Sequence, residues 1–366
     1  MLRGISLAGL VASMAYTAFA AWKVWRRTIA EIPAGGPAPR VTVAKPLHGL
    51  EPEIEENLRS FAEQDYPDYE LIFAASDASD PAVAVARPLG EVIVAPPWIG
   101  PNEKVNSLAA IAGKAKGDVL VVSDSDMRVG PEYLRAVTFP FQDARVGAVT
   151  CLYTGRPLPG VPSLLGAMHI NEEFRASVLV ALAMQPLDFC LGATMAVRRE
   201  ALESIGGFAA LSGFLADDYM LGHRLRQQGW DIRLAAYDVE TIVSERSMRD
   251  LFLHEIRWAR TIRTVRPIGW AGSILTMLLP WTMAFLLLSR FSRTAIWISA
   301  GAAALRLLLH AASGKQRLTS VLWIPVRDLL TFVVYCCSHL GRNVQWKQAR
   351  FNVSTDGQLH PDGARP

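Results

Sequence analysis

Apolar residues gather at both ends of the chain, while the middle alternates short apolar runs with polar stretches. The segment from Ile5 to Trp22 contains no charged residue and has about the minimum length of a membrane-spanning helix. Lys23, Arg26 and Arg27 follow it directly, and such a basic cluster stays on the cytoplasmic side. The pattern predicts an N-terminal anchor, with the rest of the chain beginning in the cytoplasm.

A cleaved signal peptide is the alternative for this segment. Ala18-Phe19-Ala20 has the small-x-small form of a cleavage site. The n-region holds only Arg3, however, and a basic cluster directly after the site opposes export. A Pro/Gly-rich linker, IPAGGPAPR, then separates the anchor from the next part of the chain.

From residue 41 to about residue 151, strand-length apolar runs alternate with helical patterns. The runs are VTVAKPL, YELIFAAS, EVIVA, DVLVVSDSD and VGAVTCLY. Helices are predicted at roughly Glu51–Glu63 and Val105–Lys116, and another after Pro131. This order is typical of a largely parallel sheet covered by helices. It predicts an α/β, doubly wound, Rossmann-like fold, whose ligands bind beyond the carboxyl ends of the strands.

Three apolar segments follow Pro267. They are GWAGSILTMLLPWTMAFLLLS, TAIWISAGAAALRLLLHAA and SVLWIPVRDLLTFVVYCCSHL. The second carries Arg306 and His310, and the third carries Arg327 and Asp328. Either these charges pair within a helix bundle, or the segments lie at the membrane interface. The number of spans and the side of the tail stay open.

Composition supports a membrane protein and argues against nucleic acid as a partner. Hydrophobic residues make up 51% of the chain and charged residues 19%, below the roughly 25% charged of an average soluble domain. A net charge of +3 is too small to indicate nucleic-acid binding. The four cysteines form no metal-binding or disulfide pattern, so we expect reduced thiols and no structural zinc.

Two carboxylates, Asp124 and Asp126, directly follow the apolar run VLVV. A strand would deliver both to a loop at the sheet edge, where a turn lets one bind a divalent cation and the other act through water or a ribose. Mg²⁺ or Mn²⁺ held jointly with a substrate diphosphate suits such a pair. A solvated turn is the alternative reading of an isolated Asp-x-Asp.

Two further acidic positions give this pair a context. Asp77 ends another strand-like run, where a carboxylate can hold a nucleobase or ribose, although Asp80 instead suits a cap for the helix that Pro81 begins. Asp217 and Asp218 open a helical pattern, where acids are favoured in any protein. The second of them is a candidate general base, taking a proton from an acceptor hydroxyl.

The sequence His254-Glu255-Ile256-Arg257-Trp258 forms a fourth element. Its His, Arg and Trp can share one side of a helix, and guanidinium and indole N–H groups can steady a departing diphosphate. The alternative is a basic amphipathic helix on lipid headgroups, which Arg260, Arg263 and Arg266 extend. Both readings can hold together.

These four elements, in this order, resemble the ceramide glucosyltransferase-like family of glycosyltransferases, which have a GT-A domain. The resemblance covers residues 41–266. The matching motifs are KPLHG, QDYPDYE, SDASDPA, NEKVNSL, SDSDMRV, RREALESIGGF, LADDY and HEIRW. Several motifs in one order are far more specific than any single motif.

The resemblance implies an inverting transfer from a UDP-sugar to a membrane lipid, with Mg²⁺ or Mn²⁺ as cofactor. The roles it implies are donor binding for Asp77, Lys45, Lys104 and Asp124, metal binding for Asp124 and Asp126, general base for Asp218, and a catalytic motif in His254, Arg257 and Trp258. One position departs from the family, whose motif usually begins with Gln or Arg where this chain has His254.

The HxxRW variant followed by ARTIR resembles the hopanoid-biosynthesis branch, which implies transfer of N-acetylglucosamine to a hopanoid polyol. Glucosylation of ceramide is the alternative, because both acceptors need only an apolar slot that opens to the bilayer. Residues 161–190 are candidates to line that slot, or form ordinary core and a covering helix.

Two readings compete with a lipid glycosyltransferase. A processive polysaccharide synthase needs a polymer channel, which these few apolar segments build poorly. An inactive membrane scaffold is disfavoured because every acidic position expected to act is filled. The expected location is the inner (cytoplasmic) membrane, with the catalytic domain in the cytoplasm. The predicted parts are an anchor at 1–27, a linker at 28–40, the GT-A domain at 41–266, membrane segments at 267–340 and a tail at 341–366.

Overall fold

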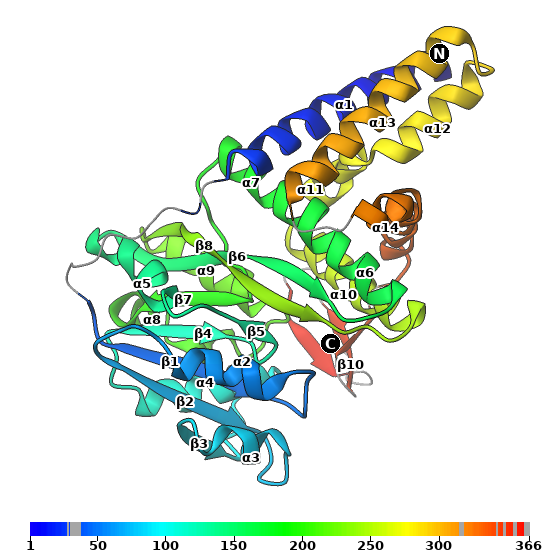
Figure 1. Cartoon of the computed structure of the whole chain (residues 1–366). Helices are drawn as coiled ribbons and strands as arrows, with labels where there is room; N and C mark the ends of the chain where they lie inside the picture. The colour runs from blue at the N-terminus through cyan, green and yellow to red at the C-terminus, as the bar shows by residue number, and fades with distance from the viewer. Residues whose placement is uncertain are drawn as a thin grey trace. The chain divides into compact units, whose positions relative to one another are not determined.

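The computed structural model describes residues 1–27, 29, 38–314, 318–341, 343–346, 349–353 and 357–361 (Figure 1). The chain forms two compact units. The sheet unit comprises Thr28–Arg156, Pro186–Ile242 and Phe351–Pro366, and the helical unit comprises Met1–Arg27, Pro157–Gln185 and Val243–Arg350. Most of the predicted linker lies outside the described residues.

The sheet unit is built on one eight-stranded sheet with helices around it. Its strands are β1 (Val41–Leu47), β2 (Tyr69–Ala75), β3 (Glu91–Val94), β4 (Val119–Ser123), β5 (Met127–Arg128), β6 (Val146–Pro157), β7 (Thr194–Arg198) and β8 (Asp231–Val243). Its helices are α2 (Ile54–Ala62), α3 (Ala82–Ala86), α4 (Glu103–Lys114), α5 (Tyr133–Thr138), α8 (Arg199–Ser204) and α9 (Asp217–Gln227), with short 3₁₀ turns at Phe139–Gln142 and Phe208–Leu211.

The strand order is β3-β2-β1-β4-β7-β6-β8-β5. The first four strands pair in parallel, as the apolar runs predict. In the other half, β7 pairs antiparallel with β4 and β6, and β5 with β8. The expectation of a largely parallel sheet therefore holds for one half and is wrong for the run VGAVTCLY, which forms β6.

Successive side chains of a strand point to opposite faces of the sheet. Both sets are buried in the central strands, so helices cover both faces of the parallel half. Val41 and Val43 of β1 belong to the core that Phe61 of α2 and Tyr133 of α5 complete, and the two rings meet edge to face at 5.5 Å. Helix α4 packs against β1 and β2 with its buried apolar residues. The predicted helices are present, with bounds shifted by one to three residues.

The helical unit contains the apolar ends of the chain. Its helices are α1 (Leu2–Trp25), α6 (Val161–Met168), α7 (Arg175–Met184), α10 (Met248–Val265), α11 (Pro267–Gly272), α12 (Leu278–Leu288), α13 (Arg293–Ser313) and α14 (Ile324–Ser338). Short turns join them at η2 (His169–Phe174, a π-helix), η4 (Ser273–Thr276) and η5 (Leu318–Trp323).

The last described residues of the chain form a second sheet of three short strands, which are β9 (Asn343–Trp346), β10 (Ala349–Val353) and β11 (Leu359–Pro361). Residues from Phe351 onward belong to the sheet unit.

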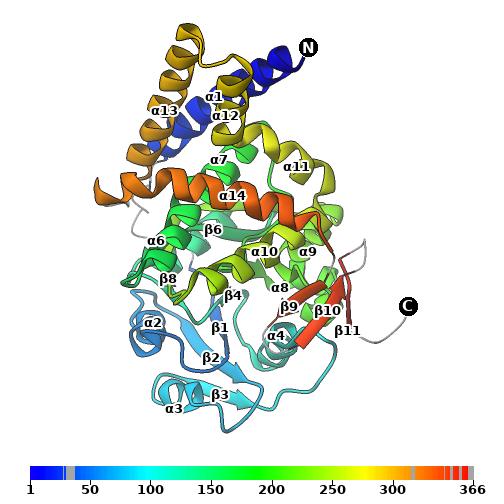
Figure 2. The ribbon, with the colours of Figure 1, turned by 90° about the vertical axis from the view of Figure 1, so that its right-hand side faces the viewer.

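Helices α1, α12 and α13 lie side by side (Figures 1 and 2). Gly9 of α1 permits this close packing, since a Cβ there would lie 2.3 Å from the Trp281 ring. Among the described residues, three helical segments have the length and composition of membrane spans: Leu2–Trp25, Arg293–Ser313 and Thr319–Ser338. The uncharged segment after Pro267 is instead bent by 55° between Thr276 and Leu278, as in a broken span or a re-entrant loop.

The charges in the last two apolar segments pair inside the helical unit, which decides between the two possibilities raised by the sequence. Arg306 donates to Glu172 at 2.6 Å and to Asp328 at 2.8 Å. Arg327 donates through both terminal nitrogens to Glu255, at 2.6 and 2.7 Å. These buried pairs join α13 and α14 to η2 and α10, and Figure 2 shows α14 lying over α6 and α10.

The two units divide the chain differently from the predicted parts. Residues 157–185 and 243–266 were expected within the catalytic domain, yet they cluster with the apolar helices. The ion pairs of Glu172 and Glu255 explain this grouping, because each carboxylate is bonded to an arginine of a C-terminal helix. Such ion pairs join residues that are far apart in the sequence, so local sequence patterns do not predict them.

Candidate active site

Parallel pairing brings Lys45 to the carboxyl end of β4. Ala44 of β1 lies opposite Val122 of β4, and Lys45 Nζ donates to the backbone carbonyl of Asp124 just beyond that strand. The Lys45 side chain is fully buried, with its ammonium 3.6 Å from the centre of the Phe61 ring. Burial lowers the pKa of Lys45 to about 7, against the opposing pull of the nearby carboxylates.

A second lysine contacts the same aspartate through its side chain. Lys104 Nζ lies 2.6 Å from Asp124 Oδ1. Lys104 lies in the first turn of α4. Asn102 caps this helix, since its Oδ1 accepts from the Val105 backbone N–H at 3.1 Å. The neighbouring carboxylates raise the pKa of Lys104 despite its burial. Asp124 is thus held by one lysine at its backbone and by another at its carboxylate.

Carboxylates crowd around the loop that follows β4. Asp126 Oδ2 accepts from the Thr241 hydroxyl at 3.0 Å, and burial together with the Asp124 charge raises the pKa of Asp126 to about 6. Glu51 accepts from the Ser125 hydroxyl at 2.8 Å, and burial together with the Asp126 charge raises its pKa to about 7. Burial is the larger cause of both pKa shifts, and the negative charge of neighbouring carboxylates adds to it.

Asp217 and Asp218 form the first turn of α9. Asn102 Nδ2 donates to the Phe214 carbonyl at 2.9 Å and lies 3.4 Å from Asp217 Oδ1, so one buried amide ties the start of α4 to the start of α9. Asp218 Oδ1 accepts from the Tyr219 backbone N–H at 2.8 Å. Burial and the Asp217 charge raise the pKa of Asp218 to about 6, although Lys104 opposes the shift.

Gly192 leaves room for the Asp218 carboxylate. A Cβ at this position would lie 3.0 Å from Asp218 Oδ2, so Gly192→Ala is expected to displace that oxygen by a few tenths of an ångström. We expect the turnover of the protein to fall about tenfold or more, with its melting temperature little changed. Gly113→Ala in α4, which meets open space, is the matched control, and equal turnover for the two variants would contradict this role of Gly192.

Asp77 follows β2 and is exposed. Its Oδ1 accepts from the backbone N–H and the hydroxyl of Ser79 at 2.7 and 2.8 Å, and these bonds lower its pKa. Asp80 Oδ1 accepts from the Ala82 backbone N–H at 2.9 Å, at the start of α3. Asp80 therefore has the capping geometry expected from the sequence, whereas the Asp77 carboxylate faces solvent.

The HxxRW motif lies in the helical unit, on α10. His254 Nδ1 is 2.7 Å from Glu245 Oε1, and the His254 ring meets the Trp258 ring edge to face at 4.2 Å. Arg257 is partly exposed on the same helix. The motif thus belongs to one unit, while the six predicted lysine and aspartate positions belong to the other.

The arginines after the motif have partners within the protein. Arg260 donates to the Leu340 carbonyl at 2.7 Å, and Arg263 donates to the Gly341 carbonyl at 2.7 Å. These carbonyls lie just past the end of α14, where cations are favoured. Both arginines thus bind carbonyl groups that follow α14. The sequence analysis considered only lipid headgroups as partners for them and did not predict these contacts.

Three polar residues of these clusters were missed by the sequence analysis: Glu51, Asn102 and Glu245. Asn102 lies in the motif NEKVNSL, which offered a signal. The others have no local signature, because their contacts join distant segments. Among the described residues, no group of three or more His, Cys, Asp or Glu side chains is arranged to hold a metal ion, so a cation at Asp124 and Asp126 would need ligands from a substrate or water.

The family model of glycosyl transferase family 21 matches residues 5–359. The chain belongs to this family, which confirms the resemblance to ceramide glucosyltransferases, and its α/β domain is of the GT-A type. Ceramide glucosyltransferase 3 of Caenorhabditis elegans is 22% identical over 345 residues, covering 88% of this chain and 74% of that protein. The ceramide glucosyltransferase of Komagataella phaffii is 34% identical over 101 residues, covering 24% of this chain and 20% of that protein. The protein is thus a hexosyltransferase.

Two solved structures are similar at a greater distance. TarS 1-349 of S. aureus in complex with UDP-GlcNAc is 14% identical, with a TM-score of 0.40 over 89% of this chain and 100% of that one. Glucosyl-3-phosphoglycerate synthase of Mycobacterium tuberculosis, in complex with Mn²⁺, UDP and glucosyl-3-phosphoglycerate, is 17% identical, with a TM-score of 0.37 over 70% of this chain and 86% of that one.

Proposed function

We propose that this protein is an inverting glycosyltransferase that moves N-acetylglucosamine from UDP-GlcNAc onto a hydroxyl group of a membrane lipid. The favoured acceptor is a hopanoid polyol such as bacteriohopanetetrol. Transfer of glucose from UDP-glucose to ceramide is the alternative, supported by the ceramide glucosyltransferase relatives. The observation that carries the proposal is the cluster of Asp218, Lys104 and Asp124 beyond the strands of the GT-A sheet.

In this reaction the acceptor oxygen attacks the anomeric carbon of the sugar, the bond from that carbon to UDP breaks, and the hydroxyl proton passes to Asp218. A raised pKa suits this role, because a carboxylate with a pKa of about 6 binds the proton more strongly than an ordinary aspartate. Attack from the face opposite the leaving group inverts the anomeric centre in one step. Asp77, exposed after β2, is proposed to hold the uridine.

The donor diphosphate is proposed to lie near Lys45, Lys104 and the Asp124 loop. The acidic groups there fit a divalent cation, because burial and, after it, the charge of neighbouring carboxylates raise the pKa values of Asp126 and Glu51, and a bound cation would offset that charge. Asp124 and Asp126 would hold a Mg²⁺ or Mn²⁺ ion, which when bound neutralises charge on the departing UDP. Lys104, paired with Asp124, is close enough to share that task.

Removal of divalent cations is expected to stop transfer. Chelation with EDTA should lower the rate by at least about 10²-fold, the size of effect typical of a lost transition-state charge interaction. Added Mn²⁺ or Mg²⁺ should restore the rate, and a titration of each ion measures which one the site prefers. Full activity in excess chelator would contradict the metal assignment.

The transfer rate is expected to fall below about pH 6. Asp218 must be a carboxylate to accept a proton, and its pKa is raised to about 6, so acid protonates it first and the rate falls tenfold per pH unit. Asp126, also with a pKa of about 6, steepens the fall when the cation is limiting. A profile of kcat/KM from pH 4.5 to 8 at saturating Mn²⁺ isolates Asp218, and a flat acidic limb would contradict its role as the base.

His254, Arg257 and Trp258 are proposed to act in the same transfer, with Arg257 and Trp258 steadying the leaving group. The His254 position is where the chain departs from the usual motif, and its Nδ1 contacts Glu245 Oε1 at 2.7 Å. This arrangement leaves Nε2 for a polar partner, which supports a role in acceptor choice. The three candidate spans support a multi-pass protein, proposed to lie in the inner membrane with its catalytic domain in the cytoplasm.

A transfer assay in membranes that contain the protein tests the proposal. A hopanoid polyol and ceramide are offered separately, each with UDP-GlcNAc or UDP-glucose, and the product lipids are identified by mass. A hopanoid carrying one N-acetylglucosamine supports the favoured branch. Glucosylceramide alone would keep the chemistry and overturn the acceptor.

A further inference from the structure

Trp258 of the HxxRW motif is flanked by two imidazole rings from different elements. His254, one turn earlier on α10, meets it edge to face with ring centres 4.2 Å apart. His169, from η2, stacks on it with ring centres 6.1 Å apart and planes inclined by 29°. The indole therefore has a ring neighbour from its own helix and one from a segment almost ninety positions earlier in the sequence.

The π-helix η2 and a glutamate hold His169 in place. Its Nδ1 lies 3.0 Å from Glu173 Oε2, and the nearby Glu173 raises the pKa of His169 against the effect of burial. Single π-turns within α-helical stretches are rare and occur frequently at functional sites. Here the π-turn lies between α6 and α7, at the point where His169 meets the motif.

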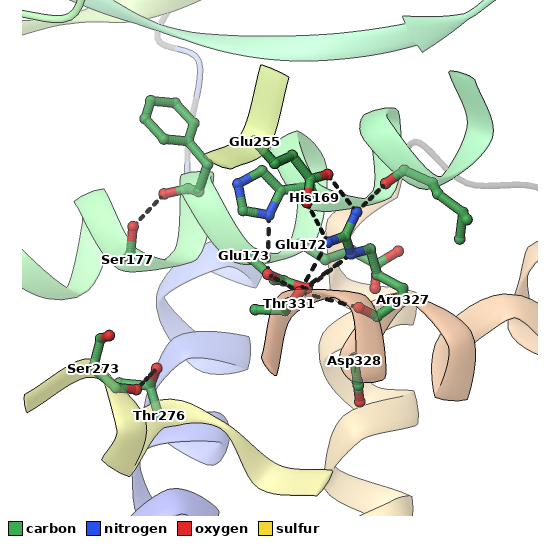
Figure 3. A network of polar contacts seen from close by, with 12 residues as sticks. His169, Glu172, Glu173, Ser177, Glu255, Ser273, Thr276, Arg327, Asp328 and Thr331 are labelled. Carbon is green, nitrogen blue, oxygen red and sulfur yellow. Dashed lines mark hydrogen bonds and ion pairs between the residues drawn. The ribbon is translucent and has the colours of Figure 1, made fainter. Parts of the chain in front are cut away.

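Glu173 is in turn held by α14 (Figure 3). The Thr331 hydroxyl donates to it at 2.8 Å, and Arg327 Nε lies 3.6 Å from Glu173 Oε1. The same Arg327 binds Glu255, which belongs to the HxxRW segment itself. Two routes thus converge on the motif: one through the backbone of α10 and one through Glu173 and His169.

Such a network is costly to build. Arg327 is fully buried and Glu255 is 4% exposed, and buried ion pairs commonly stabilise a protein no better than apolar residues of the same size. A network of this kind can instead hold the side chain at its end in one defined arrangement. Here the side chain at the end of the network is the Trp258 indole.

We propose that His169 is a positioning residue for sugar transfer: it fixes the plane of the Trp258 indole, and Glu173 and Arg327 fix His169. The proposal rests on the proposed function, in which Trp258 steadies the departing diphosphate. A ring held before the donor binds needs no ordering during the reaction.

Steady-state kinetics in a double-mutant cycle test the coupling. His169→Ala is expected to lower kcat about tenfold while the KM for the UDP-sugar changes less than about twofold. His169→Phe, which keeps a flat ring, should recover part of the loss. In the Trp258→Phe background, His169→Ala should change kcat by less than about twofold. An equal loss in both backgrounds, or no loss in the native one, would overturn the proposal.

A second measurement does not depend on turnover. In protein labelled with 5-fluorotryptophan, the ¹⁹F resonance of Trp258 is identified by its absence in Trp258→Phe. His169→Ala should shift or broaden this resonance. His339→Ala removes an imidazole that contacts Tyr335 of α14, and it should leave the Trp258 resonance unchanged. A Trp258 resonance insensitive to His169 would overturn the proposal. Absence of transfer in the native protein, with the ¹⁹F shift present, would instead refute the proposed function and leave the ring contact standing.

Discussion

Asp218→Asn is expected to abolish sugar transfer while donor binding survives. The amide keeps the shape of the carboxylate but cannot accept the acceptor's proton, and loss of a general base typically costs about 10²- to 10⁴-fold in rate. Because burial and the Asp217 charge raise the pKa of Asp218, the neutral amide removes a repulsion and should not destabilise the fold. Initial rates in membranes and UDP affinity measure the two halves of this expectation.

Asp65→Asn is the matched control for Asp218→Asn. Asp65 pairs with Arg135 at the surface, and its side chain is 67% exposed. The same substitution there should leave the rate within about twofold of the native protein, since exposed ion pairs contribute little. Asp218→Asn with near-native turnover would remove Asp218 as the base.

Arg327→Met is expected to produce the largest loss of stability in the helical unit. The methionine fills much of the same volume but leaves the buried Glu255 and the partly buried Glu173 without the guanidinium that faces both. Breaking a buried pair by removing one partner costs about 3 to 5 kcal/mol. Thermal unfolding of the purified protein in detergent should show a clearly lower melting temperature.

Two variants keep this expectation testable. Adding Glu255→Gln to Arg327→Met removes one stranded charge and should recover part of the lost stability. Arg135→Met, which breaks the exposed pair with Asp65, should cost less than about 1 kcal/mol. A single Arg327→Met variant as stable as the native protein would show that the network contributes nothing to the fold.

The sequence predicts the parallel half of the sheet well because the apolar residues of each strand follow from that strand's own burial. Strands β1 (VTVAKPL) and β4 (VLVVS) are buried on both faces, so they read as largely apolar runs. The run VGAVTCLY is just as apolar, yet β6 is antiparallel to β7. Burial alone carries no information on strand direction, and this is why that part of the prediction failed.

The acidic positions were found because each directly follows a strand or opens a helix. Local pattern placed Asp124 and Asp126 at the sheet edge and Asp218 at the start of a helix. The described structure brings Lys104 to Asp124 as well. Their roles in the reaction remain predictions. His169 and Glu173 lie in a segment that the sequence reads equally well as acceptor slot or ordinary core.

The charged residues in the apolar segments show the limit of local pattern most clearly. Arg306 and Arg327 are separated by 134 and 72 positions from the glutamates they bind. A single sequence gives no indication of such partners, so pairing and interfacial location could not be separated. The structure separates them because both arginines are buried with bonded carboxylates.

The most direct test of the central claim is the anomeric configuration of the product lipid. The native protein, in membranes supplied with UDP-GlcNAc and a hopanoid polyol, should yield a lipid with one sugar, and NMR of its anomeric proton should show a β linkage from the α-linked donor. This result would establish a single inverting transfer to a lipid. An α-linked product, a chain of sugars, or no product with any donor and acceptor pair would contradict the account.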